Sequence, residues 1–220
     1  MGAELRYALV VFDWDGTLVD SPAAIVECIQ QASRDLGLEA PAPERASHVI
    51  GLGLEDSLRQ AVPQLPRERY GEFAASYRRH FLAREDSMPL FAGVPRLLER
   101  LRSRGHRLAV ATGKSRRGLE RALAASGLGI HFSSSRCADE TVPKPDPAML
   151  RELMAELEVQ PERVLMIGDT SHDLLMARSA GVAALAVSYG AHPETKLRAL
   201  EPLACLASVE ELDKWLTLHG

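Results

Sequence analysis

The feature that most constrains the fold is a short apolar segment near the N-terminus that ends in two aspartates. Residues 5–12 are apolar except for Arg6, and their length and Val/Phe content predict a strand buried on both faces. Because side chains alternate along an extended chain and Gly16 permits a turn, we expect Asp13 and Asp15 to face one point beyond this strand. That edge of an open α/β sheet is where ligands bind.

Strand and helix patterns alternate in the second part of the chain, from residue 88 onward. Short apolar runs predict strands at residues 107–112, 130–134, 164–167 and 183–187. Amphipathic stripes and capping residues predict helices at residues 94–101, 115–126, 150–157, 171–180 and 209–218. The alternation predicts the α/β class, with a Rossmann-like parallel sheet flanked by helices and joined by right-handed crossovers.

An all-helical stretch interrupts this alternation. Helices are predicted at residues 22–36, with Ser21 as N-cap, and at 44–50, 54–61 and 67–84. The last helix carries a stripe that we interpret as core packing rather than a cofactor site: Tyr70, Phe73, Ala74, Tyr77 and Phe81. We predict a helical cap of residues 19–86 inserted into a core domain of residues 1–18 and 87–220, with hinges near 18–20 and 87–92.

The composition is that of a globular protein, with 46% hydrophobic residues. The net charge of -4 arises from 26 basic and 30 acidic residues without a long basic run, which argues against nucleic-acid or membrane partners. Cys28, Cys137 and Cys205 are few and far apart, which favours reduced thiols over disulfides or a zinc site. With no signal-peptide pattern and no apolar run near membrane-spanning length, we expect a cytoplasmic protein. Monomer and dimer are both open.

Further polar residues follow the predicted strands or lie in the loops beyond them. Thr112 and Gly113 could hold an anion with a hydroxyl and backbone N–H groups, although an ordinary strand-to-helix turn fits equally well. Lys144 stands between two prolines and is one of four lysines beside 22 arginines, which indicates a compact point charge. Asp169 and Asp173 straddle a helix start, where one of them could be a cap.

The carboxylates suggest a metal. Two carboxylates about 4 Å apart repel by about 4 kcal/mol at an effective dielectric of about 20, so a cation or a proton must offset the cost. Carboxylate oxygens are hard ligands, and no His/Cys cluster accompanies them in the sequence, so the expected ion is Mg²⁺. The candidate metal residues are Asp13, Asp15, Asp169 and Asp173.

These stretches resemble the four motifs of the haloacid dehalogenase-like (HAD) hydrolase superfamily. The first motif matches Asp13-x-Asp15-Gly16-Thr17, the second Thr112, the third Lys144 in Lys-Pro-x-Pro, and the fourth Gly168-Asp169-Thr170-x-x-Asp173. The helical insertion resembles the small cap of this superfamily, and residues 50–53 and 77–81 resemble its phosphoglycolate phosphatase branch. The resemblance covers nearly the whole chain.

The resemblance implies a Mg²⁺-dependent phosphatase that acts on a small organic phosphate. Asp13 would attack phosphorus and become an aspartyl phosphate. Asp15 would protonate the leaving alcohol and then activate water. Phosphoglycolate is the leading substrate, and the cap residues that could contact its carboxylate are Arg45, His48, Gly51 to Gly53 and Arg78.

The same resemblance assigns the remaining residues. Mg²⁺ would be held by the Asp13 carboxylate, the Asp15 backbone carbonyl and Asp169, with Asp173 in support. The charge that spreads over the transferring oxygens would be neutralised by Thr112, the Gly113 N–H and Lys144.

Other members of the superfamily and one unrelated class are alternatives. A phosphonate-cleaving enzyme would need a cap lysine, and residues 19–86 contain none. A sugar-phosphate mutase would need a cap histidine where this chain has Ile25. A non-enzymatic receiver-like module phosphorylated on aspartate would share the acidic pocket, but it would have no inserted cap and no task for Asp15.

Overall fold

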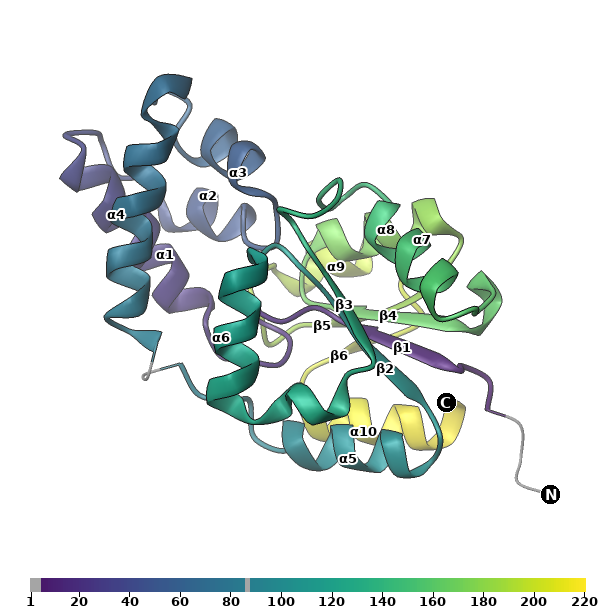
Figure 1. Ribbon diagram of the computed structural model, residues 1–220. Coiled ribbons are helices and arrows are strands. Elements are labelled where there is room, and N and C mark those ends of the chain that lie inside the picture. Colours follow the sequence, from purple (N-terminus) through teal and green to yellow (C-terminus); the bar gives the residue numbers. More distant parts are fainter. Residues whose placement is uncertain (1–4, 86–87) are drawn as a thin grey trace.

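The computed structural model describes residues 5–85 and 88–220. This part of the chain is built on a six-stranded parallel sheet in the order β3-β2-β1-β4-β5-β6 (Figure 1). The strands are β1 (Leu9–Phe12), β2 (Arg107–Thr112), β3 (Ser134–Cys137), β4 (Val164–Gly168), β5 (Ala183–Val187) and β6 (Cys205–Leu206). The predicted α/β class with a Rossmann-like sheet is confirmed.

The central strand β1 shows why its sequence is continuously apolar. Val10 and Phe12 join a cluster with α5 (Val94–Ser103), α6 (Arg116–Ser126) and α10 (Val209–His219). Leu9 and Val11 join another with α7 (Ala148–Glu156) and α8 (Ser171–Ala180). Figure 1 shows α5 and α10 on one side of the sheet and α7 and α8 on the other. Alternate side chains of one strand therefore enter opposite helical layers.

The edges of the sheet differ from the prediction. The strand predicted at residues 130–134 is wrong, because residues 128–131 form a 3-10 turn and β3 begins at Ser134. Ile130 suggested a buried strand, yet it is 75% exposed. In β3, an edge strand, only Cys137 is buried, so its sequence has no apolar run. The short elements β6 and α9 (Glu194–Arg198) were not predicted, because two and five residues are too few for a periodic pattern.

The inserted segment is a group of helices with an apolar cluster of its own. They are α1 (Pro22–Asp35), α2 (Pro43–His48), α3 (Leu54–Ala61) and α4 (Tyr70–Leu82), the last preceded by a 3-10 turn (Arg67–Arg69). The aromatic stripe of α4 contributes Phe73 and Phe81 to this cluster, and Tyr70 and Tyr77 pack against it. Figure 1 shows this cap standing to one side of the sheet.

The two connections between cap and core run side by side. The Asp20 N–H donates to the Pro89 carbonyl at 2.9 Å, and the Phe91 N–H donates to the Leu18 carbonyl at 3.0 Å. The predicted boundary between residues 86 and 87, with the start of the second predicted hinge, lies outside the described residues.

Two further observations bear on the expectations from composition. All three cysteines are free thiols, with Cys28 and Cys137 buried. None of the helices in residues 5–85 and 88–220 is both long and apolar enough to cross a membrane.

Candidate active site

The register of the sheet brings the predicted site residues together at its carboxyl edge. Phe12 of β1 is level with Ile167 of β4 and with a residue near the end of β2. Asp13, Thr112 and Asp169 thus lie at the ends of three neighbouring strands. This is the edge at which parallel α/β sheets bind ligands.

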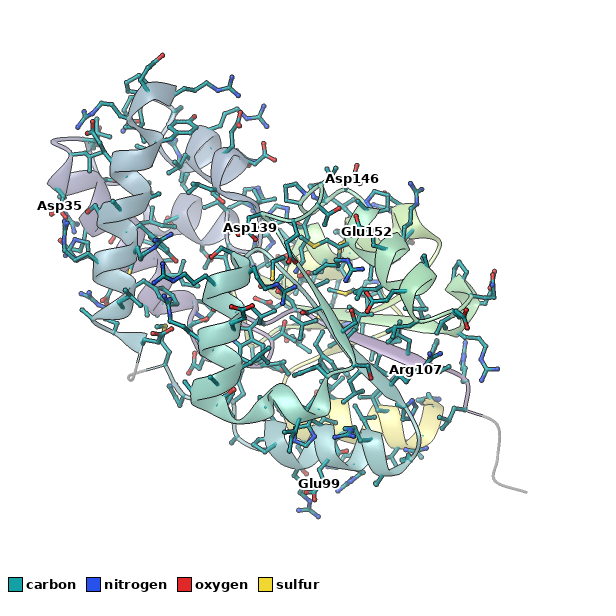
Figure 2. The ribbon with its side chains drawn as sticks, viewed as in Figure 1. Asp35, Glu99, Arg107, Asp139, Asp146 and Glu152 are labelled. Atoms are coloured by element: carbon teal, nitrogen blue, oxygen red, sulfur yellow. The ribbon has the colours of Figure 1, made fainter. Side chains whose placement is uncertain are left out.

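Figure 2 places labelled side chains relative to this edge. Arg107, the first residue of β2, lies at the opposite end of that strand. Asp35 lies on the outer side of the cap, where it accepts hydrogen bonds from Ser76 (2.6 Å) and Arg79 (2.7 Å) and contacts His80. These contacts lower the pKa of Asp35 to about 2, and the hydrogen bond from Ser76 has the largest effect. The lowered pKa of Asp35 is therefore caused by contacts on the surface of the cap and not by the site.

Lys144 is the cation at the centre of the site. Its side chain is completely buried, with Nζ 2.9 Å from Asp13 Oδ1 and 2.7 Å from Asp173 Oδ1. The Trp14 N–H donates to the same oxygen of Asp13 at 2.6 Å. The third-motif lysine and the first- and fourth-motif aspartates are therefore in direct contact.

Asp169 is held in place from both sides. Its Oδ1 accepts from the Thr17 hydroxyl at 2.8 Å, and its Oδ2 accepts from the Ala191 N–H at 2.7 Å. Gly16 adopts a φ of +78°, and a Cβ there would lie 2.1 Å from Asp169 Oδ2. A side chain at position 16 would thus occupy the space that this carboxylate fills.

Asp173 serves two neighbours at once. Its Oδ2 accepts from the N–H (3.0 Å) and the hydroxyl (2.7 Å) of Thr170, so it forms a capping box at the start of α8. Its Oδ1 faces Lys144. Thr170 is therefore the N-cap of α8, and of the two aspartates it is Asp173 that takes part in the capping while it also faces the site.

The buried carboxylates of Asp13, Asp169 and Asp173 fit a divalent cation. Their oxygens lie within 4.8 Å of one another. Burial, reinforced by Asp173 and Asp169, raises the pKa of Asp13 well above 3.8 despite the opposing effect of Lys144. Burial and Asp173 raise the pKa of Asp169 to about 7. Asp13 Oδ2 is buried without a hydrogen-bond partner. A hard cation would supply that partner and the missing positive charge.

The Asp15 side chain is not part of this carboxylate group and has different partners. Its Oδ1 accepts from the Ser21 hydroxyl at 2.8 Å, and its Oδ2 lies 2.9 Å from Lys114 Nζ. Ser21 is the N-cap residue of α1, as predicted, with Pro22 at the first helical position, but its hydroxyl is turned to Asp15 and makes no side-chain cap bond. The same Lys114 Nζ lies 4.5 Å from the ring centre of Phe81 in α4. Lys114 thus joins Asp15 to the cap.

The cap is closed over the second motif. The Thr112 hydroxyl accepts from the Lys114 N–H at 3.2 Å. A Cβ on Gly113 would lie 2.7 Å from the Gly51 carbonyl oxygen. A Cβ on Gly51, in turn, would lie 3.7 Å from Asp13 Oδ2. Glycine at 113 therefore allows the cap loop to approach the core, and the phosphate-binding residues predicted from sequence lie under that loop.

A cavity of about 260 Å³ lies between the cap and the core. Its core side includes Asp13, Asp15, Thr112, Gly113 and Lys114. Apolar or aromatic side chains make up most of its cap side: Ile25, Ile29, Val49, Ile50, Leu52, Leu54, Leu58, Ala61, Phe73, Ala74, Tyr77 and Phe81. Phe73, Tyr77 and Phe81 of the aromatic stripe therefore pack the cap and also line this cavity. Asp13 and Asp15 thus line a chamber that is mainly apolar.

The cap residues suggested by sequence fall in three places. Gly51 and Arg78 line the cavity, whereas Arg45 is exposed and does not. A Cβ on Gly53 would lie 2.8 Å from Pro143, so this glycine packs against the loop that carries Lys144. His48 packs elsewhere, beside core histidines.

The carbonyl of His48 fastens the cap to the core. It lies 2.7 Å from His172 Nε2 and 3.1 Å from His192 Nε2. His192 Nδ1 accepts from the Ser171 N–H, so its Nε2 carries the proton and donates. Although the three rings lie close enough to hold a metal ion, two of their nitrogens are thus directed at this carbonyl. Burial, followed by the charge of His172, lowers the pKa of His192 to about 4.

Sequence reasoning missed Lys114 and the contact between the Ser21 hydroxyl and Asp15. The signal for Lys114 was its place directly after Thr112 and Gly113 in a chain with four lysines. No local pattern could have found the histidine contacts, which join residues 124 and 144 positions apart.

Comparison with known proteins agrees with this geometry. The sequence model of the haloacid dehalogenase-like hydrolase family matches residues 10–187. "Probable phosphatase IndB" of Dickeya dadantii is 38% identical, over 93% of this chain and 91% of that protein. A 5'-nucleotidase of Pseudomonas aeruginosa is 34% identical over 99% of each chain. A phosphoglycolate phosphatase of Cupriavidus necator is 33% identical, over 94% of this chain and 92% of that one.

The fold recurs among solved structures. A predicted phosphatase from Clostridium acetobutylicum superposes with a TM-score of 0.86 at 24% identity, over 98% of this chain and 100% of the other.

Proposed function

The chain belongs to the haloacid dehalogenase-like hydrolase family and is a phosphatase of that family; from this premise we propose that it hydrolyses a small organic phosphate monoester with Mg²⁺, through a phosphorylated Asp13. The observation that carries the proposal is the buried, unpartnered Oδ2 of Asp13. This residue lines the cavity and is surrounded by a lysine and two further carboxylates.

Asp13 is the proposed nucleophile. Lys144 and the Trp14 N–H both contact Oδ1, which orients the carboxylate and leaves Oδ2 available. Attack by a carboxylate oxygen breaks the phosphorus–oxygen bond of the ester and forms an aspartyl phosphate, which water then hydrolyses. Lys144 balances the negative charge of the carboxylate group through both steps.

Asp15 is the proposed general acid and base. Its two oxygens are oriented by Ser21 and Lys114, and the residue lines the cavity beside Asp13. It would give a proton to the leaving alcohol and later take one from the attacking water. The closed cap limits the water that reaches the phosphoenzyme.

Mg²⁺ fits the carboxylates of Asp13 and Asp169, with Asp173 in support and the backbone carbonyl of Asp15 as the further ligand that the family resemblance implies. When bound, it supplies positive charge that lets an anionic nucleophile approach an anionic phosphate. Thr112 and the Gly113 N–H are the proposed contacts of the transferring phosphoryl oxygens.

Phosphoglycolate is the substrate that the family resemblance suggests. Its carboxylate would need a cationic contact, and Arg78 is the cap cation that lines the cavity. A sugar-phosphate mutase is less well supported, because the position of its cap histidine is taken by Ile25, an apolar residue of the cavity wall.

We place the reaction in the cytoplasm, in keeping with the free thiols.

The test is hydrolysis of p-nitrophenyl phosphate by the purified chain with Mg²⁺ and with a chelator. We expect repeated turnover with Mg²⁺ and almost none with the chelator. Transfer of one phosphoryl group per chain without turnover would instead support the receiver-like alternative. No transfer at all would contradict both.

A further inference from the structure

The cap side of the cavity differs chemically from what an acidic substrate needs. Its wall includes Ile25 and Ile29 of α1, Leu58 of α3, and Phe73 and Ala74 of α4. These side chains offer no hydrogen bonds and no charge. A carboxylate or a sugar hydroxyl placed among them would lose hydration without gaining a partner.

The hydroxyl groups of this wall offer little compensation. Ser57 also lines the cavity, but its hydroxyl donates to the Val49 carbonyl at 3.2 Å. Tyr77 presents a phenol, and burial raises its pKa well above 10, with Asp15 adding to the effect. Tyr77 is thus a neutral group with a large apolar ring and a single polar atom.

Most of the cations that line the cavity already have a carboxylate partner. Lys114 lies 2.9 Å from Asp15, and Arg121 lies 3.6 Å from Glu85. Arg78 has no ion pair within residues 5–85 and 88–220, but it is exposed to solvent. A solvated guanidinium is a weak anchor for a carboxylate, because it exchanges water for the new contact at little gain.

We propose that this cavity selects phosphate monoesters whose leaving alcohol carries an apolar body, aliphatic or aromatic, which packs among Ile29, Leu58, Phe73 and Ala74. The proposal rests on the proposed phosphatase function for the orientation of the ester, with phosphorus at Asp13 and the alcohol under the cap. Phosphoglycolate is then a poorer substrate than an alkyl phosphate of similar size.

The first test measures binding without catalysis. Ethyl-, butyl- and hexylphosphonate, which carry no ester bond, are titrated calorimetrically with Mg²⁺ present, together with 3-phosphonopropionate as the carboxylate-bearing counterpart of the butyl compound. We expect the dissociation constant to fall by about threefold to fourfold for each methylene that the wall buries. We also expect butylphosphonate to bind more tightly than 3-phosphonopropionate.

A pair of neighbouring alanines on α4 supplies the matched variants. Ala74 lines the cavity, whereas Ala75 is exposed and does not. Ala74→Leu should fill part of the chamber, so hexylphosphonate should lose about tenfold in affinity and ethylphosphonate much less. Ala75→Leu should bind both compounds as the parent chain does.

Steady-state hydrolysis of the matching alkyl phosphates separates the two proposals. Equal dissociation constants along the series, or tighter binding of 3-phosphonopropionate that Arg78→Leu removes, would overturn the apolar pocket even if every ester is hydrolysed. A chain-length preference in binding without any hydrolysis would uphold the pocket and overturn the proposed hydrolysis of small monoesters through Asp13.

Discussion

The two sides of the cavity follow different rules. On the core side, Asp13 lines the cavity and is surrounded by Lys144, Asp169 and Asp173. These four residues are fully or almost fully buried and make charged contacts with one another or hydrogen bonds to neighbouring groups. On the cap side, apolar side chains contact one another without directional bonds. The core side therefore has little tolerance for substitution, whereas the cap side can change in shape without changing the chemistry.

Replacing Asp13, the proposed nucleophile, tests the core side most severely. Asp13→Asn keeps the shape but removes the charge and the nucleophilic oxygen, so we expect kcat to fall to the limit of detection, beyond about a hundredfold or 2.7 kcal/mol. The fold should survive, because the variant no longer buries this carboxylate. The measurement is kcat with p-nitrophenyl phosphate, together with Tm.

Asp35→Asn is the control, because it also removes a carboxylate with a displaced pKa, but on the outer side of the cap. Its kcat should equal that of the parent chain. If Asp13→Asn kept more than a hundredth of the parent activity, Asp13 would not be the nucleophile.

Lys144 should matter for stability as well as for rate. A lysine that only neutralised the transferring oxygens would affect kcat more than stability when it is replaced. Lys144 is completely buried between Asp13 and Asp173, and removing one partner of a buried ion pair leaves an uncompensated charge and costs about 3–5 kcal/mol. We expect Lys144→Met without metal to unfold at lower urea concentration, with Mg²⁺ recovering part of the loss.

Lys214→Met, which removes an exposed lysine, should leave the urea midpoint within error of the parent. If Lys144→Met matched that control in stability, the charge balance drawn for the core side would be incorrect.

The carboxylates also predict how Mg²⁺ stabilisation depends on pH. The pKa of Asp169 is raised from 3.8 to about 7, so within that window the folded metal-free chain binds more protons than the unfolded chain. This contribution to stability is present below about pH 4 and is lost as the pH rises through 7. Bound Mg²⁺ replaces the proton, so the rise in Tm on adding it should be large at pH 8 and small at pH 5.

The buried histidines act in the opposite direction, because the pKa of His192 is lowered to about 4. Their contribution is lost as the pH falls from about 6.5, with or without metal, so it cancels in the difference between the two melting curves. A Tm increment with Mg²⁺ that did not change between pH 5 and pH 8 would contradict the shifted carboxylates.

Replacing Lys114 should have the smallest effect of these changes. Lys114 links the core side to the cap side, but it does not contact the buried charges of Asp13, Lys144, Asp169 and Asp173. Lys114→Met should lower kcat by about tenfold, since Asp15 loses one of its two orienting contacts and the Phe81 ring loses its cation. Ser21→Ala, which removes the other contact to Asp15, should lower kcat by a similar amount. Unchanged kcat in both variants would show that Asp15 needs no positioning.

The core side could be predicted from sequence because strand geometry determines it. Once Leu9–Phe12 and Val164–Gly168 were recognised as buried strands, the residues after them had to meet at the carboxyl edge. For this reason the sequence was enough to name Asp13 and Asp169, which follow those strands, as site residues. Lys114 was missed because its partner Asp15 comes from another strand end and its aromatic contact from the cap.

The cap side could not be predicted in the same way. Helical spacing showed that Phe73 and Phe81 face inward, but the same spacing serves a packed core and a cavity wall. Only the placement of the cap over Gly113 reveals that these residues do both. The prediction of the edge strand β3 was wrong for a related reason. Ser134–Cys137 is held by backbone pairing to β2, and most of its side chains are not buried, so its sequence has no apolar run.

The most direct test of the central claim is to trap the phosphorylated nucleophile. Asp15→Asn should still accept a phosphoryl group from p-nitrophenyl phosphate, whose leaving group needs no proton, but should hydrolyse the intermediate slowly. Acid quenching followed by mass spectrometry should then find one phosphoryl group on the peptide that contains Asp13, and none in the double variant with Asp13→Asn. A variant that releases p-nitrophenol in excess over the chain with no modified peptide, or one modified at another residue, would contradict the account.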